Sequence, residues 1–454
     1  MSFFSRSKTY DVQARRKGRW TIEQTASDQA SAETMAKALL SKLKDIEAVR
    51  VVLDSKPNEP LFEQEKPQVT APLAVPQIDE APLCATPDDL YRAPARKTLN
   101  RLFRQYLDKS PLTPTEIMHL GREMKRINDF ESIVQTAIDR AARVQKGPEG
   151  EDAKKRTDAL WKLAEAVTKR ANEADKLKLP SIREVGFDEA IRQVFKSAKP
   201  EDLAFQLRCT IARELSQTRS WYGKLMQAME WNNATKETAT VALLDDFTSD
   251  TLGSATLITD LLGQQPTLID ALFKLLDMAE GKFKGPGKGQ SAEIAQVEEA
   301  LCKLMATNRL PASQDILMER VRVELRGSNP LVRNNQIVEQ NRFREFIQRV
   351  LGENGVLGGP GMAEALVQRA ATVLEMGGPN GLRAGVGWIV EAGASSLANA
   401  NFVVALSGTR MASALEAVLS TELKKQIAGI TDQAARARIL AQLDQQMKTA
   451  QKAG

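Results

Sequence analysis

The sequence predicts a mainly α-helical protein: a multi-helix body, built as a helical bundle or an irregular helix-pair array, behind a small N-terminal ββαβ (α+β) module. Aromatic residues make up only 5% of the 454 residues, so the core must consist chiefly of Leu, Ala, Val, Ile and Met, which suit helices. Apolar residues also recur at helical spacing over most of the chain after residue 95. Eight of the 19 prolines fall between Pro57 and Pro94, and they separate the two parts.

Residues 1–56 change periodicity twice and are predicted to form the ββαβ module. Apolar and polar residues alternate over 10–14 and again over 20–23, on either side of a turn-like Arg-Arg-Lys-Gly sequence, which is typical of a β-hairpin. Asp28 can cap a helix whose apolar residues are spaced by four. The sequence AVRVVL at 48–53 then predicts a strand. Such a unit can bury one face of a sheet under one helix.

Residues 57–94 are predicted to be a proline-rich, acidic, flexible tether. Proline at this density removes the backbone donors that helices and sheets need. Residues 54–90 carry eight Asp/Glu against two Lys/Arg, whereas residues 1–53 carry ten Lys/Arg against six Asp/Glu. A basic module is therefore followed by an acidic segment, and the opposite charges can attract each other within one molecule.

Residues 95–454 are predicted to form the helical body. Its first helix is indicated by apolar residues at helical spacing over 99–107. The sequence Thr-Pro-Thr-Glu at 113–116 combines an N-cap, a proline in the first turn and a glutamate at the third position, so it predicts a helix start. The glycine-rich stretch 281–290 is a candidate point of division. Residues 120–130 resemble part of a tetratricopeptide unit, but no steady 34-residue period follows and no family is assigned.

The sequence contains no recognisable set of catalytic, cofactor-binding or metal-binding residues. His119 is the only histidine; we expect it to be partly exposed on its helix, without the acid and nucleophile that a triad needs. Cys84, Cys209 and Cys302 are widely spaced and include no CxxC pair. Neither a disulfide framework nor a zinc site is therefore predicted.

Two further patterns are predicted to be structural. The adjacent acids Asp245-Asp246 and Glu298-Glu299 diverge on a helix, so we expect them to be surface charges. The loop 281–289 carries three lysines among its glycines. It lacks the GxxxxGK[ST] pattern and the preceding strand that a phosphate-binding P-loop requires. We interpret it as a loop between helices.

The tip of the first hairpin is a candidate contact for nucleic acid or for a partner protein. Four cations lie beside a tryptophan there: Arg15, Arg16, Lys17, Arg19 and Trp20. Basic residues next to an aromatic side chain can grip a phosphate backbone and stack on a base. Four exposed cations on a hairpin also fit a plain solvated tip, and an acidic segment lies nearby in the sequence.

The glycine-rich region 352–393 is a second candidate surface. Small residues allow helices to approach each other closely, and Gly385, Gly387 and Gly393 are expected at such contacts. These contacts can lie within the body, or they can line a groove for a partner helix.

These observations predict a cytoplasmic, non-enzymatic adaptor or regulatory scaffold that binds protein partners through its helical body. No apolar run is long enough to span a membrane, and no cofactor is expected. The tethered module would raise the effective concentration of one bound partner near the other. Two alternatives remain open: a nucleic-acid-associated regulator that uses the basic hairpin, and an enzyme that relies on carboxylate or lysine chemistry without a recognisable motif.

Overall fold

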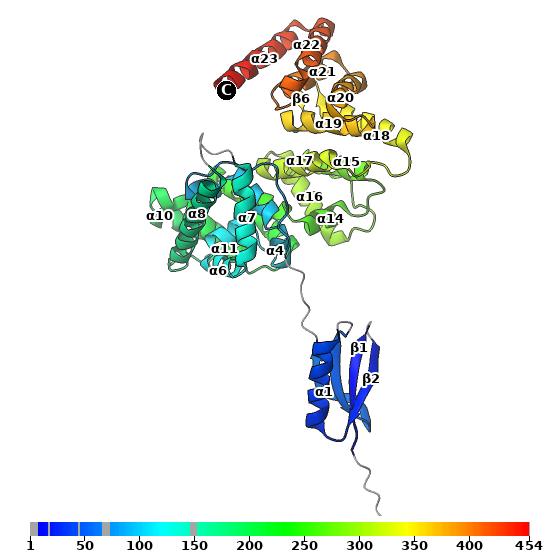
Figure 1. The fold of residues 1–454 in the computed structure, drawn as a ribbon. Helices are drawn as coiled ribbons and strands as arrows, with labels where there is room; N and C mark the ends of the chain where they lie inside the picture. The colour runs from blue at the N-terminus through cyan, green and yellow to red at the C-terminus, as the bar shows by residue number, and fades with distance from the viewer. Residues whose placement is uncertain (1–7, 17–18, 44–45, 66–72, 146–151, 454) are drawn as a thin grey trace, which may run out of the picture. The chain divides into compact units, whose positions relative to one another are not determined.

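The computed structural model describes residues 8–16, 19–43, 46–65, 73–145 and 152–453 (Figure 1). Contacts divide the chain into two compact units, residues 1–73 and residues 74–454. We call them the N-terminal unit and the helical unit. The first contains a small antiparallel sheet and one helix, and the second is almost entirely helical. The predicted fold class, mainly α with a small N-terminal α+β module, is confirmed.

The N-terminal unit is a four-stranded antiparallel sheet in the order β2-β1-β3-β4, with one helix packed on one face. Alternate side chains of β1 and β3 point towards the helix and are fully buried, because successive residues of a strand face opposite sides. The core of this unit consists of Val12, Ala14, Ala32, Ala36, Leu40, Ile46, Val49 and Val51. The elements are β1 (Tyr10–Arg16), β2 (Arg19–Ala26), α1 (Gln29–Lys42), β3 (Ala48–Leu53) and β4 (Lys56–Glu65).

The fourth strand, β4, differs from the prediction that a flexible tether begins at residue 57. Strand β4 pairs with β3, with Val51 opposite Phe62, so the unit is ββαββ rather than ββαβ. The strand lies at the edge of the sheet, and within the described part of the chain β3 is its one strand neighbour. Pro57 and Pro60 are tolerated there because an edge strand does not need every backbone N–H for pairing. The proline-rich residues at the end of this unit therefore form an edge strand and not a linker.

Most of the described part of the remaining predicted tether, residues 74–94, belongs to the helical unit. Val75, Ile78 and Cys84 are buried, and the backbone N–H of Ala74 donates to the side-chain oxygen of Gln105 at 2.7 Å. Two helices, α2 and α3, begin before residue 94. Residues 66–72 lie outside the described part of the chain. The segment 74–94 is thus part of the folded helical unit and not an extended spacer.

The helical unit begins with short helices and continues with longer ones, which Figure 1 shows from cyan to red. Its first half contains α2 (Pro87–Leu90), α3 (Ala93–Leu102), α4 (Arg104–Lys109), α5 (Pro114–His119), α6 (Gly121–Asn128), α7 (Glu131–Val144), α8 (Ala153–Ala174), α9 (Ile182–Val185), α10 (Phe187–Ser197), α11 (Pro200–Leu215) and α12 (Trp221–Ala234). Its second half contains α13 (Thr238–Leu252), α14 (Ala255–Leu262), α15 (Leu268–Ala279), α16 (Ala292–Ala306), α17 (Pro311–Arg326), α18 (Gln336–Val350), β5 (Leu351–Gly352), β6 (Gly355–Val356), α19 (Gly359–Val373), α20 (Gly378–Ala392), α21 (Ser396–Ser407), α22 (Ala412–Gly429) and α23 (Gln433–Ala453).

The glycine-rich stretch 281–290, the candidate point of division, does not divide the helical unit. One hydrophobic cluster runs from Trp221 to Ile439 and includes buried residues on both sides of this stretch. The loop is also held in place, since the backbone N–H of Gln264 donates to the carbonyl of Lys288 at 3.0 Å. Among the helices of the described residues, none is long and apolar enough to cross a membrane.

Candidate functional site

Two cavities in the first half of the helical unit are lined by residues of the same segments. In three places, two consecutive residues line different cavities; these places are the end of α2 with its C-cap, α3 and α5. The pairs are Leu90 and Tyr91, Ala95 and Arg96, and Met118 and His119; the first of each pair lines an apolar cavity and the second a polar one. Helix α8 contributes to both cavities, with Val167 and Arg170. A few short elements therefore position two chemically different walls.

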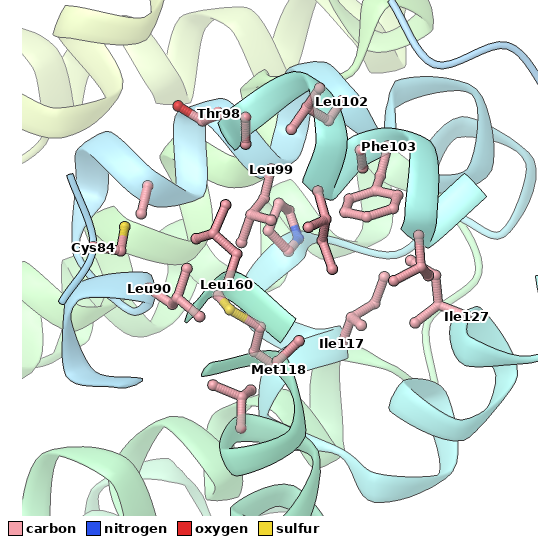
Figure 2. Close-up of a pocket in the computed structure, with 18 of the residues that line it drawn as sticks. Cys84, Leu90, Thr98, Leu99, Leu102, Phe103, Ile117, Met118, Ile127 and Leu160 are labelled. Carbon is pink, nitrogen blue, oxygen red and sulfur yellow. The ribbon is translucent and has the colours of Figure 1, made fainter. Parts of the chain in front are cut away.

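The apolar cavity has a volume of about 130 Å³. Figure 2 shows Leu99, Phe103, Ile117 and Met118 arranged around a common space, with Leu160 of α8 beside them. Its walls are almost entirely carbon, and an apolar cavity of this kind gives water no hydrogen-bond partners. A larger apolar side chain on one of its walls can fill part of this space.

Replacing Ala137, which lines this cavity on α7, by valine is expected to raise the free energy of unfolding by about 0.5–1.5 kcal/mol. The two added methyl groups would occupy space that is already open, so they gain burial without displacing neighbours. The measurement is urea denaturation followed by circular dichroism. Ala190→Val is the matched control, because Ala190 is fully buried in a tightly packed cluster on α10. That change should lower stability by about 1–3 kcal/mol, and equal effects at both positions would contradict the prediction.

The polar cavity, which we call the His119 cavity, has a volume of about 380 Å³. That size falls within the range of about 300–1,000 Å³ that is common for small-molecule sites. Its walls combine rings with charged side chains from α2, α3, α5, α8, α11 and α13. The lining residues are Asp88, Tyr91, Arg92, Ala93, Arg96, His119, Arg170, Glu201, Ala204, Phe205, Arg208 and Asp246.

His119 is buried, with only 1% of its surface exposed. The prediction that it is partly exposed was wrong, because every residue of the six-residue helix α5 is buried. Its Nδ1 lies 2.7 Å from the carbonyl oxygen of Thr115. A carbonyl can only accept, so Nδ1 carries the proton and Nε2 is a bare acceptor. Burial lowers the pKa of His119 to about 3, and the neighbouring Arg208, Arg96 and Arg170 act in the same direction.

Three rings surround the inner end of this cavity. The ring of His119 lies 4.9 Å from that of Tyr91 and 4.9 Å from that of Phe205. The guanidinium of Arg170 stands over Phe205, 4.1 Å from the ring centroid. Burial raises the pKa of Tyr91 to about 12, and the positive charge of Arg170 opposes that shift only in part. The tyrosine is therefore a protonated hydroxyl at neutral pH.

The arginines of the His119 cavity are neutralised by carboxylates. Asp246 accepts hydrogen bonds from both Arg96, at 2.6 Å, and Arg208, at 3.0 Å. Arg170 pairs with Asp88 at 2.9 Å. The rim residue Arg92 pairs with Asp89 at 3.3 Å. The cavity therefore has no large excess of positive charge.

Three buried polar atoms of residues that line the His119 cavity have no hydrogen-bond partner among the described residues. They are Nε2 of His119, an acceptor, Nε of Arg208, a donor, and the hydroxyl group of Tyr91, which can do either. Buried polar groups are nearly always paired, and each one that is not needs an explanation. All three atoms are shielded from solvent by the surrounding side chains.

The basic hairpin tip is less available to phosphates than its sequence suggests. Arg15 forms an ion pair with Glu47 at 3.4 Å, and Arg16 forms one with Glu23. Two guanidinium groups contact the Trp20 ring, that of Arg15 at 5.5 Å and that of Arg50 at 4.5 Å from its centroid. A phosphate would have to compete with these carboxylates for the arginines.

Two other residues of the hairpin cannot be placed as contacts. Lys17 lies outside the described residues, and Arg19 is described only as the first residue of β2. Of the four cations, Arg15 and Arg16 thus have described contacts, and both contact acidic side chains.

The three candidate glycines do not line one groove. A Cβ at Gly385 would lie 2.9 Å from the carbonyl oxygen of Val367, so this glycine allows α20 to pack closely on α19. A Cβ at Gly393 would clash with the side chain of Asn399, whose amide caps the same turn. Only Gly387 faces open space. Two of the three positions are thus filled by contacts within the helical unit.

The adjacent acids that were expected at the surface are partly in the core. Asp245 is buried and accepts from the backbone N–H groups of Ala312 and Ser313, at 2.6 and 3.0 Å. It therefore caps the first turn of α17. Glu298 is also buried and pairs with Lys274 at 3.0 Å. The expectation was wrong because these partners come from distant parts of the chain.

Cys84, Cys209 and Cys302 are free and buried. Burial raises the pKa of each thiol, to about 12 for Cys209 and Cys302. Among the described residues, no group of three or more His, Cys, Asp or Glu side chains is placed to hold a metal ion.

Sequence reasoning did not identify the His119 cavity as a site. Tyr91 follows α2, Arg170 lies on α8, and Phe205 and Arg208 lie on α11. None of them forms a local motif with His119. Comparison of the chain with protein-family models, with curated proteins and with solved structures gives no significant match.

Proposed function

We propose that this chain is a cytoplasmic adaptor that binds a protein partner through its helical unit and carries the N-terminal unit as a second binding unit. The observation that carries this proposal is the division into two units, each with its own hydrophobic core. Two folded binding units in one chain raise the effective concentration of one bound partner near the other.

The helical unit offers an apolar surface at the start of α18 and after the end of α19. Ile337 is 73% exposed, and Val338 and Met376 are exposed as well. The two segments lie side by side, because the amide of Gln336 donates to the carboxylate of Glu375 at 3.2 Å. Exposed apolar side chains that gather at one place favour protein binding over a purely solvated surface.

The N-terminal unit offers the face of its sheet that α1 does not cover. Trp20 and Arg50 lie on this face, and Ile22 on β2 is 58% exposed. Gln13 accepts a hydrogen bond from Arg50 at 2.8 Å, which fixes the guanidinium against the tryptophan ring. A flat face with an aromatic ring and an ordered arginine suits a protein partner, since interfaces are enriched in both residue types.

The test is quantitative affinity capture from cells that make the protein, comparing the full chain with fragments 1–73 and 74–454. The helical fragment should retain the main partner, and Ile337→Ser should reduce its capture by about tenfold. Leu440→Ser is the matched control, because Leu440 is 48% exposed on α23 and its replacement should have little effect.

The fragment 1–56 tests the fold of the N-terminal unit. It lacks β4, so it should unfold more readily than the fragment 1–73.

Two outcomes would contradict the proposal. Capture of the main partner by 1–73 alone would place the principal binding surface on the wrong unit. Tight nucleic-acid binding by 1–73 that weakens steeply with salt would favour the nucleic-acid-associated alternative instead.

A further inference from the structure

We propose that the apolar cavity of the helical unit binds a small, uncharged hydrocarbon of about the size of one six-membered ring, such as an aromatic or alicyclic ring compound. This inference goes beyond the adaptor function and does not depend on it. The cavity lies in the first half of the helical unit, whereas the proposed partner surface is formed by α18 and the segment after α19.

The first step is size. The cavity has a volume of about 130 Å³, and voids larger than a water molecule are few in a protein interior. An engineered cavity of about 150 Å³ with walls of Leu, Ile and Phe stays dry and binds benzene or xenon. In Figure 2 the side chains of Leu99, Phe103 and Ile117 surround one common space of the same kind. The size of the cavity therefore suits one small ring.

The second step is charge. Within the described part of the chain, no Asp, Glu, Lys, Arg or His side chain lines this cavity. Leu, Ile, Val, Met, Phe, Ala and Pro form nearly all of its wall. An ion that entered would lose its water and meet no opposite charge, which is expensive. The cavity therefore selects against ions of either sign.

The third step is hydrogen bonding. Four lining residues have polar side chains that already make hydrogen bonds elsewhere: Cys84, Thr98, Asn128 and Gln145. The amide of Gln145, for example, donates to the carbonyl of Pro82 at 2.6 Å and accepts from Arg156 at 2.6 Å. None of the buried polar atoms that lack a partner among the described residues belongs to this wall. A polar ligand would therefore be desolvated without compensation.

The fourth step is the preference for a ring. Met118, Met124 and Phe103 all line the cavity. Methionine is unbranched and polarizable, so it adapts to the shape of an occupant and makes favourable contacts with aromatic rings. The phenylalanine ring can pack against a second ring in an offset or edge-to-face arrangement. These side chains favour a compact ring over an extended chain.

The cavity adjoins a groove that opens at the protein surface. This groove, of about 540 Å³, runs along α8 and shares Asn128, Val134 and Ala164 with the wall of the cavity. Asn128 is exposed and Ala164 is half-buried, so the shared wall reaches the surface. A small hydrocarbon can therefore approach the cavity between α7 and α8.

The experiment uses the full chain with ¹³C-labelled methionine methyl groups. Met118 and Met124 line the cavity, whereas Met278 and Met362 are buried in the other hydrophobic cluster and serve as internal references. The probes are toluene and phenol, which share a ring and differ in a methyl against a hydroxyl group. Toluene should move the resonances of Met118 and Met124 in a saturable way and leave the references unchanged. Phenol should bind at least about tenfold more weakly, because its hydroxyl group would be buried without a partner.

Variants show where the probe binds. Ala137→Val adds two methyl groups to the same space and should weaken toluene binding about 3- to 10-fold. Ala417→Val is the matched control, because Ala417 is exposed on α22 and its replacement should leave binding unchanged. Toluene should also raise the Tm of the natural chain, since a ligand that binds only the folded state stabilises it. That rise should be smaller in Ala137→Val than in Ala417→Val.

Several results would overturn the proposal. If toluene moves neither the Met118 nor the Met124 resonance and leaves the Tm unchanged, the cavity takes no ligand. If phenol binds as tightly as toluene, the site does not select apolar molecules. If toluene moves Met278 and Met362 to the same extent, it enters the core without specificity. Equal toluene affinity of Ala137→Val and Ala417→Val would place the probe outside the cavity.

Discussion

Replacing Lys224 by methionine is expected to destabilise the helical unit by about 3–5 kcal/mol. Lys224 on α12 forms an ion pair with Glu116 on α5, and both side chains are fully buried. Glu116 also accepts the backbone N–H of Thr113 at 2.7 Å. Without the lysine, a carboxylate remains in the core with no countercharge. Urea denaturation followed by circular dichroism measures the loss.

The control for this prediction is the double variant Glu116→Gln/Lys224→Met, which removes both charges. It should recover most of the stability, because a neutral amide is far cheaper to bury than a lone carboxylate. A single variant that loses less than about 1 kcal/mol, or a double variant that is no better than the single one, would show that the pair is not the source of the effect.

The single variant Lys224→Met should also change how the free energy of unfolding depends on pH. Burial raises the pKa of Glu116 even beside Lys224, and removing the lysine removes a group that lowers it. The pKa of this carboxyl in the folded state then lies above its value in the unfolded state, about 4.3. The stability that this carboxyl contributes is fully present below its unfolded-state pKa, and it is lost as the pH rises through its folded-state pKa. The deficit relative to the natural chain should therefore be larger at pH 8 than at pH 5.

Replacing Arg369 by methionine is expected to cost about 3–5 kcal/mol as well, by a different mechanism. Arg369 on α19 is 1% exposed. Its guanidinium donates to four backbone carbonyls at the end of α17, those of Glu324, Leu325, Gly327 and Asn329, at 2.7–2.9 Å. The last carbonyls of a helix have no partner within the helix. Methionine fills similar space but removes all four donated hydrogen bonds, and within the described part of the chain only the carbonyl of Glu324 keeps another partner, the backbone N–H of Gly327 at 3.2 Å.

Two further variants separate hydrogen bonding from charge at this position. Arg369→Lys keeps the positive charge but cannot reach four carbonyls, so it should recover only part of the loss. Arg344→Met removes an exposed arginine that stacks on Trp388, and it should cost less than about 1 kcal/mol. Amide hydrogen exchange should show faster opening of the last turn of α17 in Arg369→Met. Unchanged exchange there would contradict the mechanism.

Features that depend on nearby residues were predictable from the sequence. The helix start at Thr113 is confirmed, with its side chain accepting from the backbone N–H of Glu116 and Glu116 accepting in return. Both capping hydrogen bonds join residues three positions apart. The hairpin of β1 and β2 and the cap at Asp28 are confirmed for the same reason.

Features that depend on distant residues were not predictable. The exposure of His119 was judged from one helical face, but a short helix surrounded by other helices has no exposed face. Asp245 was judged from its neighbour Asp246, whereas its partner Ser313 lies 68 residues further along the chain. The His119 cavity likewise depends on packing among α5, α8 and α11. Sequence periodicity carries no information on which helices meet.

The buried contact between Arg96 and Asp250 has a consequence for how the protein is made. The guanidinium on α3 meets its carboxylate at 3.2 Å, across 154 residues of chain. At a synthesis rate of about 5–20 residues per second, a ribosome needs roughly 8–30 s to produce that length. During this time α3 is outside the ribosome without the partner that neutralises its arginine. The N-terminal end of the helical unit is therefore completed late in translation, although its residues are made early.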